Sequence, residues 1–169
     1  MSLLDLPAGI APKFPFPAIS APEPFTIPER VYSPVPSRLR MASLTDSESS
    51  ITACWFTRHH DGFVRERFFG SLTTFDSVWT VAYAVALSSD YVIEIIRSIW
   101  ERRSLFDVSI LGGFLRDNPL FYRRTRSKII SYWNCYYRHS FPRFTDYTGG
   151  HILNFFDECI SNTQSTGSA

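Results

Sequence analysis

The sequence predicts an all-α protein, built as stacked helical hairpins or as a compact helical bundle, with an extended proline-rich arm at its N-terminal end. Three observations lead to this prediction. Nine of the eleven prolines lie within the first 36 residues. Between residues 46 and 160, helix-capping residues recur before apolar residues at helical spacing. Period-two alternation, which marks half-buried strands, is hard to find there.

The predicted arm covers residues 1–45. Each proline removes a backbone donor and favours extended geometry in the residue before it, so no helix is sustained at the start of the chain. Two interpretations compete: a disordered arm with polyproline-type binding motifs, or a strap that buries its apolar residues on the helical domain. We favour the strap, because solvated linkers seldom carry so much aromatic surface. The apolar residues are Phe14, Phe16, Ile19, Phe25, Ile27, Val31 and Tyr32. At the other end, the polar stretch 161–169 is predicted to be a disordered tail.

The helical domain spans residues 46–160. Its helices are predicted from capping residues, each followed by apolar residues at helical spacing. In the helix after Asp90, for example, Ile95 and Ile99 fall on one face and Glu94 lies away from it. The predicted starts, in order, are Asp61, Asp76, Asp90, Asn118 before Pro119, and the segment from Asp146 to Gly150.

Three of these starts are almost evenly spaced. Asp61, Asp90 and Asn118 are 29 and 28 residues apart, and a shift of 28 residues sets FVRE (63–66) over YVIE (91–94). Between the amphipathic helices lie stretches that are apolar nearly all round, at 78–87 and 108–115. The paired glycines Gly112 and Gly113 fall inside the second stretch, where they favour close helix contact or a kink. This alternation is typical of stacked helical hairpins.

The segments HHDGFVRERFFGSL and SSDYVIEIIRSIW resemble the short, degenerate HEAT-like repeats of bacterial helical-repeat proteins. In those repeats an aspartate and a turn residue open a helix of the form Val-Arg-Glu before an apolar stripe. The resemblance covers residues 59–117 and extends toward residue 138, although the third unit, which begins at Asn118, lacks the Val-x-Glu element. HEAT-like proteins mostly bind other macromolecules and share no common chemistry, so the resemblance implies a binding function.

The segment from Phe114 to Arg138, FLRDNPLFYRRTRSKIISYWNCYYR, mixes aromatic and cationic residues. With about 100° between successive residues, a helix that starts at Pro119 gathers an aromatic stripe, which we predict faces the core. The stripe consists of Tyr122, Ile129, Trp133 and Tyr136. Arg126 projects into this stripe, where a charge is costly unless it is paired. We therefore predict that Arg126 forms a buried structural ion pair with a carboxylate from another helix. The candidate partners are Asp90, Glu94 and Asp107.

Positive charge concentrates in the same region. From Phe114 to Thr145 the local balance is +6, although the formal net charge of the chain is +1. We predict a non-catalytic protein-binding or scaffold module that uses this basic face, with an acidic protein surface as its partner. RNA or another polyanion is the alternative, but a nucleic-acid surface normally leaves aromatic rings exposed for stacking. The predicted basic face consists of Arg116, Arg123, Arg124, Lys128, Arg138 and Arg143.

No known catalytic motif is present, so we predict no catalytic residue and no cofactor, and an enzyme of unknown class is the third hypothesis. The cluster of His59, His60 and Asp61 is the one place that suggests a metal or acid–base site. Adjacent residues diverge, however, and no further histidine lies at metal-ligand spacing. We therefore predict that Asp61 caps a helix and that no metal binds here.

The cysteines and the hydropathy pattern bear on location. Cys54, Cys135 and Cys159 form no closely spaced pair, which predicts buried thiols in a reducing compartment. The N-terminus has no basic leader, and the longest uncharged run of the helical region, SVWTVAYAVALSS, is too short to span a bilayer. These features predict a cytoplasmic protein without membrane association.

Overall fold

The computed structural model describes residues 25–165 of the chain. Eight α-helices lie in this range, and its β-structure is confined to isolated bridges, among them Val31–His59 and Phe75–Phe106. The all-α prediction is therefore confirmed for the described part of the chain. The α-helices are α1 (Arg38–Ala42), α2 (Asp46–Phe56), α3 (Gly62–Ser71), α4 (Val78–Leu87), α5 (Ile93–Glu101), α6 (Val108–Asp117), α7 (Pro119–Tyr132) and α8 (Thr148–Ser165). Two 3-10 turns, η1 (Arg103–Leu105) and η3 (Phe144–Asp146), and one π-helical turn, η2 (Trp133–Tyr137), complete the helical structure of these residues.

Aspartates mark the starts of the two helices that the sequence places one repeat apart. The Asp61 carboxylate accepts a hydrogen bond from the backbone N–H of Phe63 at 2.8 Å, so Asp61 caps α3 as predicted. Asp90 lies two residues before Val92, which occupies the cap position of α5. Its carboxylate accepts hydrogen bonds from the N–H groups of Tyr91 and Val92, which organise the turn that leads into the helix.

The other starts lie within a residue or two of their predicted positions. α4 is capped by Ser77 rather than by its neighbour Asp76, and α7 has Pro119 in its first turn. α8 begins at Thr148 and continues to Ser165, into the stretch predicted to be a disordered tail.

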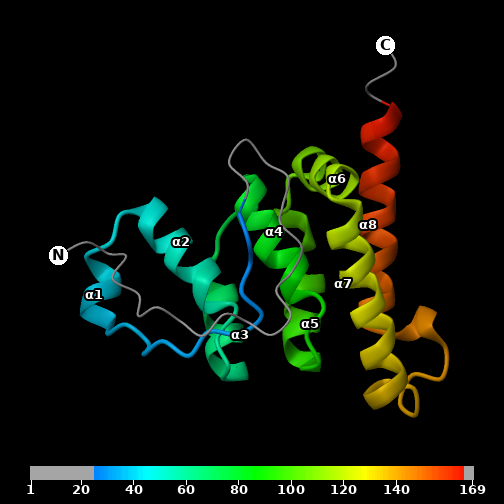
Figure 1. The fold of residues 1–169 in the computed structure, drawn as a ribbon, viewed down its shortest axis with the longest axis horizontal. Helices are drawn as coiled ribbons and strands as arrows, with labels where there is room; N and C mark the ends of the chain where they lie inside the picture. Colours follow the sequence, from blue (N-terminus) through cyan, green and yellow to red (C-terminus); the bar gives the residue numbers. More distant parts are fainter. Residues whose placement is uncertain (1–24, 166–169) are drawn as a thin grey trace.

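The helices between residues 46 and 101 form two successive hairpins, α2–α3 and α4–α5 (Figure 1). α2 contacts α4, and α3 contacts α5. The starts of α3 and α5 are adjacent, because Gly62 lies beside Val92. Their ends are adjacent too, since Phe75 and Phe106 form a parallel bridge and stack with their ring centroids 4.3 Å apart. α3 and α5 therefore occupy equivalent positions in the two hairpins.

The last three helices close the fold (Figure 1). α7 and α8 run antiparallel to each other, and α6 packs closely on α8. At the α6–α8 contact, a methyl group on Gly112 would lie 2.3 Å from the carbonyl oxygen of Cys159. The close helix contact predicted for the glycine pair is thus present, and Gly112 is the member of the pair that makes it.

One hydrophobic core joins helices α2 to α8. α4 lies within it, with seven of its ten residues buried. This burial explains why the sequence of α4 is apolar nearly all round. Among residues 25–165, no helix combines the length and the apolar character that crossing a membrane requires.

The described part of the predicted arm follows an extended path along the α2–α3 connection up to Ser37. The prediction of an extended arm is wrong for the residues that follow, because α1 occupies Arg38–Ala42. Ile27 and Val31 are buried along the extended path. The N–H of Val31 donates to the carbonyl of Arg58 at 2.8 Å, and the N–H of His60 donates to the carbonyl of Val31 at 2.9 Å. Residues 1–24 lie outside the described residues, so the strap stays a prediction for most of the arm.

The aromatic stripe of α7 is interrupted near its C-terminal end. Beyond Tyr132 the helix changes into the π-helical turn η2. A π-helical turn holds more residues than an α-helical turn, so side chains beyond its start rotate away from the stripe. Ile129 is buried as predicted, but Tyr136 is 63% exposed, and its predicted place in the core is wrong.

Candidate functional site

The predicted basic face is spread over a long stretch of the fold. Arg116 lies near the end of α6, and Arg138 and Arg143 follow η2. Between them, α7 alone has 14 residues, which corresponds to about 20 Å of helix. The remaining members lie along α7: Arg123, Arg124 and Lys128. The six cations therefore do not form one compact patch.

Among the described residues, carboxylates pair with at least three of the six cations. Arg116 lies 3.0 Å from Asp117, Lys128 lies 3.3 Å from Glu29 of the arm, and Arg143 lies 2.9 Å from Asp146. Local pairing reduces the field that such residues project toward a distant partner. Arg138 instead places its guanidinium over the ring of Trp133, 5.6 Å from the ring centroid, and its side chain is exposed.

Arg126 has a carboxylate partner from another helix, but the pair is not buried. Its Nη1 lies 2.8 Å from Oδ2 of Asp157 in α8, and the Arg126 side chain is 45% exposed. The predicted burial is wrong, and so are the candidate partners Asp90, Glu94 and Asp107. The physical reason is that α8 packs beside α7 and brings Asp157 to the edge of the aromatic stripe, where the Tyr122 hydroxyl also donates to it at 2.6 Å.

Replacing Arg126 with alanine is expected to lower the free energy of unfolding by less than about 1 kcal/mol, because solvent screens a half-exposed ion pair. Urea denaturation at low and at high salt measures the change, and the small loss should shrink further in high salt. A loss of several kcal/mol, unaffected by salt, would indicate that the pair is buried after all.

A fully buried ion pair joins α3 to the start of α5. The Arg65 side chain has no exposed surface. Its Nε lies 2.9 Å from Oδ2 of Asp90, and its Nη2 donates to Oδ1 at 3.0 Å. Nη1 donates to the carbonyls of His59 and His60, both at 2.9 Å. The guanidinium is thus fixed by a bidentate ion pair with Asp90 and by two backbone carbonyl acceptors. Arg30 of the arm adds a second cation, 3.5 Å from Asp90.

A second buried arginine holds the arm. Arg58 donates to the carbonyl of Pro28 at 3.0 Å and to that of Glu29 at 2.8 Å. Burial lowers the pKa of Arg58 to about 10, which leaves it protonated at neutral pH. We call Arg30, Arg58, Arg65 and Asp90 the arginine clamp, because together they tie the arm to the hairpins.

The sequence of α3 contains a pattern that indicates the burial of Arg65, but this pattern was not used to predict it. Arg65, Phe68, Phe69 and Leu72 are spaced i, i+3, i+4 and i+7, so Arg65 occupies the first position of an apolar stripe. The same argument that predicted burial for Arg126 applies better to Arg65, because a regular helix carries the whole stripe into the core.

Both histidines of the pair contact the arm. His59 is buried and His60 is exposed, with its ring stacked on Tyr32 at 5.0 Å between centroids. Among residues 25–165, no three His, Cys, Asp or Glu side chains are placed to hold a metal ion together. The role of Asp61 is that of a helix cap.

Four tyrosines from two segments gather at the C-terminal end of α7. We call them the tyrosine cluster: Tyr91, Tyr132, Tyr136 and Tyr137. The Tyr91 ring centroid lies 6.0 Å from that of Tyr132 and 6.4 Å from that of Tyr136. The Tyr137 hydroxyl donates to the Tyr91 carbonyl, which fastens η2 to the α4–α5 turn. Tyr91 is 45% exposed, so with Tyr136 it presents two rings to solvent.

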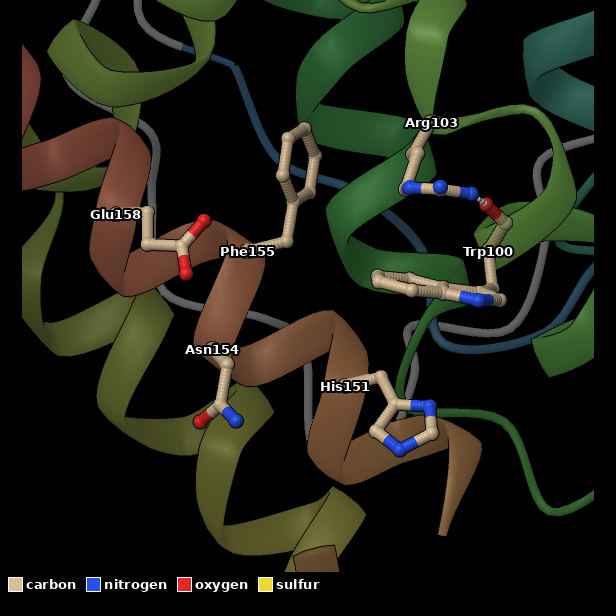
Figure 2. A pocket seen from close by; sticks show the side chains of 6 residues that line it. All are labelled: Trp100, Arg103, His151, Asn154, Phe155 and Glu158. Carbon is tan, nitrogen blue, oxygen red and sulfur yellow. Dashed lines mark hydrogen bonds between the residues drawn. The ribbon is translucent and has the colours of Figure 1, made fainter. Parts of the chain in front are cut away.

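A hollow of about 340 Å³ lies between the end of α5 and α8 (Figure 2). Arg103 covers Trp100, its guanidinium 4.2 Å from the ring centroid, and donates to the Trp100 carbonyl at 2.9 Å. The Nε2 of His151 lies 2.8 Å from the Thr145 carbonyl, so this nitrogen carries a proton. The lining residues are Trp100, Arg103, His151, Asn154, Phe155 and Glu158. None of them is a serine, threonine, cysteine or lysine, so the lining offers His151 no nucleophile to activate.

No family model, no curated protein and no solved structure matches this chain. The resemblance to HEAT-like repeats and the role of the basic face therefore stay predictions. Three features of the described residues remain as candidate sites: the tyrosine cluster, the hollow and the arginine clamp.

Proposed function

We propose that this protein is a non-catalytic protein-binding or scaffold module that uses the tyrosine cluster and the neighbouring Arg138 as its contact surface. The observation that carries the proposal is the exposure of Tyr136, at 63%, and of Tyr91, at 45%, within a group of contacting rings. Tyrosine and arginine are enriched at the centres of protein interfaces, where a few such residues supply most of the binding energy.

The cluster is built to bind without large rearrangement. Tyr91 comes from the α4–α5 turn and Tyr136 from η2, and the hydrogen bond from Tyr137 to the Tyr91 carbonyl joins the two segments. Beneath them, the Arg65 guanidinium lies 5.9 Å from the centroid of the Tyr91 ring. Side chains that are already held in place lose less conformational entropy when a partner binds.

The partner we propose is a protein with an acidic surface. The segment 114–145 carries a local balance of +6, and Arg123 on α7 and Arg138 beyond η2 are among its exposed arginines. Cations at the rim of an interface accelerate association with an acidic partner and contribute specificity. The side-by-side hairpins α2–α3 and α4–α5 support the HEAT-like interpretation, in which stacked hairpins display a binding surface. A cytoplasmic location belongs to the same proposal.

Cys135 is exposed beside the cluster, so the predicted burial of the thiols is wrong for this cysteine, and the test uses it as the attachment point for a photo-crosslinker. Cys54 and Cys159 are buried, and burial raises the pKa of their thiols to about 12 and about 11, so they should not react. A captured protein is then purified, and its affinity is measured for the unlabelled wild type and for variants.

We expect Tyr136→Ala to weaken binding of the purified partner at least about tenfold, as for an interface hot spot. Arg138→Glu should slow association, and more so at low salt. Arg40→Glu is the matched control, because Arg40 is exposed on α1, at the far side of the fold from α7 and α8 (Figure 1). Equal affinity for the wild type and Tyr136→Ala would reject the tyrosine cluster as the contact surface.

RNA binding is a second candidate, and the exposed rings of Tyr91 and Tyr136 favour it. Base stacking needs accessible aromatic faces beside cations. Fluorescence anisotropy with a single-stranded RNA at two salt concentrations tests it. Salt-dependent binding that Tyr136→Ala abolishes would support RNA as the ligand, whereas an absent or salt-independent signal would exclude it.

A further inference from the structure

His59 lies at the junction between the arm and the hairpins. Its ring is 5% exposed, and its backbone forms a parallel bridge with Val31 of the arm. Its Nε2 lies 3.2 Å from the carbonyl oxygen of Ser33, two residues further along the arm. Its Nδ1 accepts a hydrogen bond from the N–H of Asp61 at 3.1 Å. One imidazole therefore contacts both the arm and the start of α3.

These two contacts fix the protonation state of the ring. A carbonyl oxygen can only accept, so the Nε2 that faces Ser33 carries the proton. The N–H of Asp61 can only donate, so Nδ1 has a free lone pair. Only the neutral tautomer protonated at Nε2 satisfies both neighbours. A second proton, on Nδ1, would point at the N–H of Asp61 and remove that hydrogen bond.

The surroundings of His59 disfavour a positive charge. The ring of His60 lies 4.2 Å away between centroids, and Arg65 approaches from α3 to bind the His59 carbonyl. Arg58 precedes His59 in the chain, and the carboxylate of Asp90, which faces this region, is engaged by Arg65. Two described groups favour the protonated ring: the Ser33 carbonyl, which accepts from Nε2, and the Asp61 carboxylate, which already caps α3. Burial, with His60 second, outweighs them and lowers the pKa of His59.

We propose that His59 is a pH-sensitive latch, which holds the Val31–Ser33 segment of the arm on the α2–α3 connection when neutral and releases it when protonated. This regulatory role is separate from the protein-binding function proposed above. It requires no partner and concerns only the attachment of the arm.

The direction of the effect follows from linkage. The pKa of His59 is lowered from the ordinary value near 6.5 while the arm is docked, and release of the arm removes the burial that contributes most to this shift. The docked form is thus fully stabilised above the ordinary pKa and loses stability as the pH falls toward the lowered pKa. Within that window, the equilibrium constant for opening rises about tenfold for each unit of pH, because one proton is taken up on release.

Hydrogen exchange of the full chain, measured by NMR between pH 7.5 and 5.0, tests the latch. The amides of Val31 and His60 report docking, because both are bonded across the arm contact. After correction for the intrinsic exchange rate, we expect their protection factors to fall about tenfold for each pH unit within the window. The amide of Val85, in the buried α4, should keep its protection.

Two variants separate His59 from its neighbour. His59→Gln keeps one donor and one acceptor without a titrating group, so the protection of Val31 should no longer depend on pH. His60→Gln is the matched control, and it should keep a pH dependence, although a weaker one, because His60 helps to lower the pKa of His59. If His59→Gln does not fold, the imidazole nitrogen chemical shifts of His59 in the wild type still test the latch. We expect a neutral ring protonated at Nε2, titrating as the Val31 protection falls.

Three results would overturn the latch. The first is a Val31 protection factor that stays constant with pH in the wild type. The second is a pH dependence that persists in His59→Gln or disappears in His60→Gln. The third is an equal loss of protection at Val31 and Val85, which would mean that the whole domain unfolds rather than that the arm is released.

Discussion

Replacing Asp90 with asparagine is expected to lower the free energy of unfolding by about 3–5 kcal/mol, because it leaves the guanidinium of Arg65 buried without its counter-charge. Asparagine keeps nearly the shape of aspartate, and its side-chain oxygen can still accept from the N–H groups of Tyr91 and Val92. The loss of stability therefore measures the contribution of the Asp90 charge and not that of the hydrogen bonds in the turn before α5. Arg30, at 3.5 Å, loses its partner at the same time.

The matched control for this change is Asp117→Asn. Asp117 also pairs with an arginine, Arg116 at 3.0 Å, but both side chains are about half exposed. The same substitution there should cost less than about 1 kcal/mol. Guanidinium chloride denaturation of both variants measures the contrast. Equal losses would show that the Arg65–Asp90 pair contributes no more than a surface pair.

A double variant gives a further check on the same pair. Arg65→Met combined with Asp90→Asn removes both charges, so it should recover part of the stability that Asp90→Asn loses. Recovery should be incomplete, because the carbonyls of His59 and His60 lose the N–H donors of Arg65. A double variant less stable than Asp90→Asn would mean that the hydrogen bonds of Arg65 outweigh its uncompensated charge.

The adjacent glycines of α6 should respond to alanine with opposite signs. A methyl group on Gly112 would lie 2.3 Å from the Cys159 carbonyl oxygen and 2.4 Å from Thr163 Oγ1. Backbone of α8 cannot move aside alone, so α6 and α8 must separate, and we expect a loss of about 1–3 kcal/mol or more. At Gly113 the nearest atom is a terminal nitrogen of Arg116, 3.9 Å away. Alanine fits there, and its higher helix propensity should stabilise the protein by about 0.5–1 kcal/mol.

Thermal unfolding of the two variants provides the measurement. The two proteins differ only in which side of α6 carries the methyl group, so helix propensity contributes equally to both and the difference isolates the α6–α8 contact. Similar melting temperatures for Gly112→Ala and Gly113→Ala would contradict the close approach of the two helices.

Much of the helical framework was predictable from the sequence, because helix starts depend on local chemistry. Asp61 and Pro119 mark α3 and α7 through contacts within a few residues of themselves. The close contact at Gly112 was predictable for a similar reason, since a glycine inside an apolar helix sacrifices stability unless another helix needs the space.

The candidate site was less predictable, because it depends on which distant segments meet. Arg126 and Arg65 both lie in apolar stripes, but only Arg65 is buried, because α3 packs against α5. Tyr136 was placed by assuming one regular helix, and the π-helical turn after Tyr132 changes its direction. A one-residue change in helix geometry is enough to move an aromatic ring from the core to the surface.

The attachment of the arm has a consequence for synthesis of the protein. Glu29 and Lys128, which pair across the arm contact, are 99 positions apart in the chain. At about 5–20 residues per second, the ribosome needs about 5–20 seconds to reach Lys128 after it has made Glu29. The anchoring residues Arg58 and His59, between α2 and α3, emerge much earlier, so the arm can dock on the first hairpin while α7 is still missing. Docking is then completed in two stages, first through Arg58 and His59 and last through Lys128.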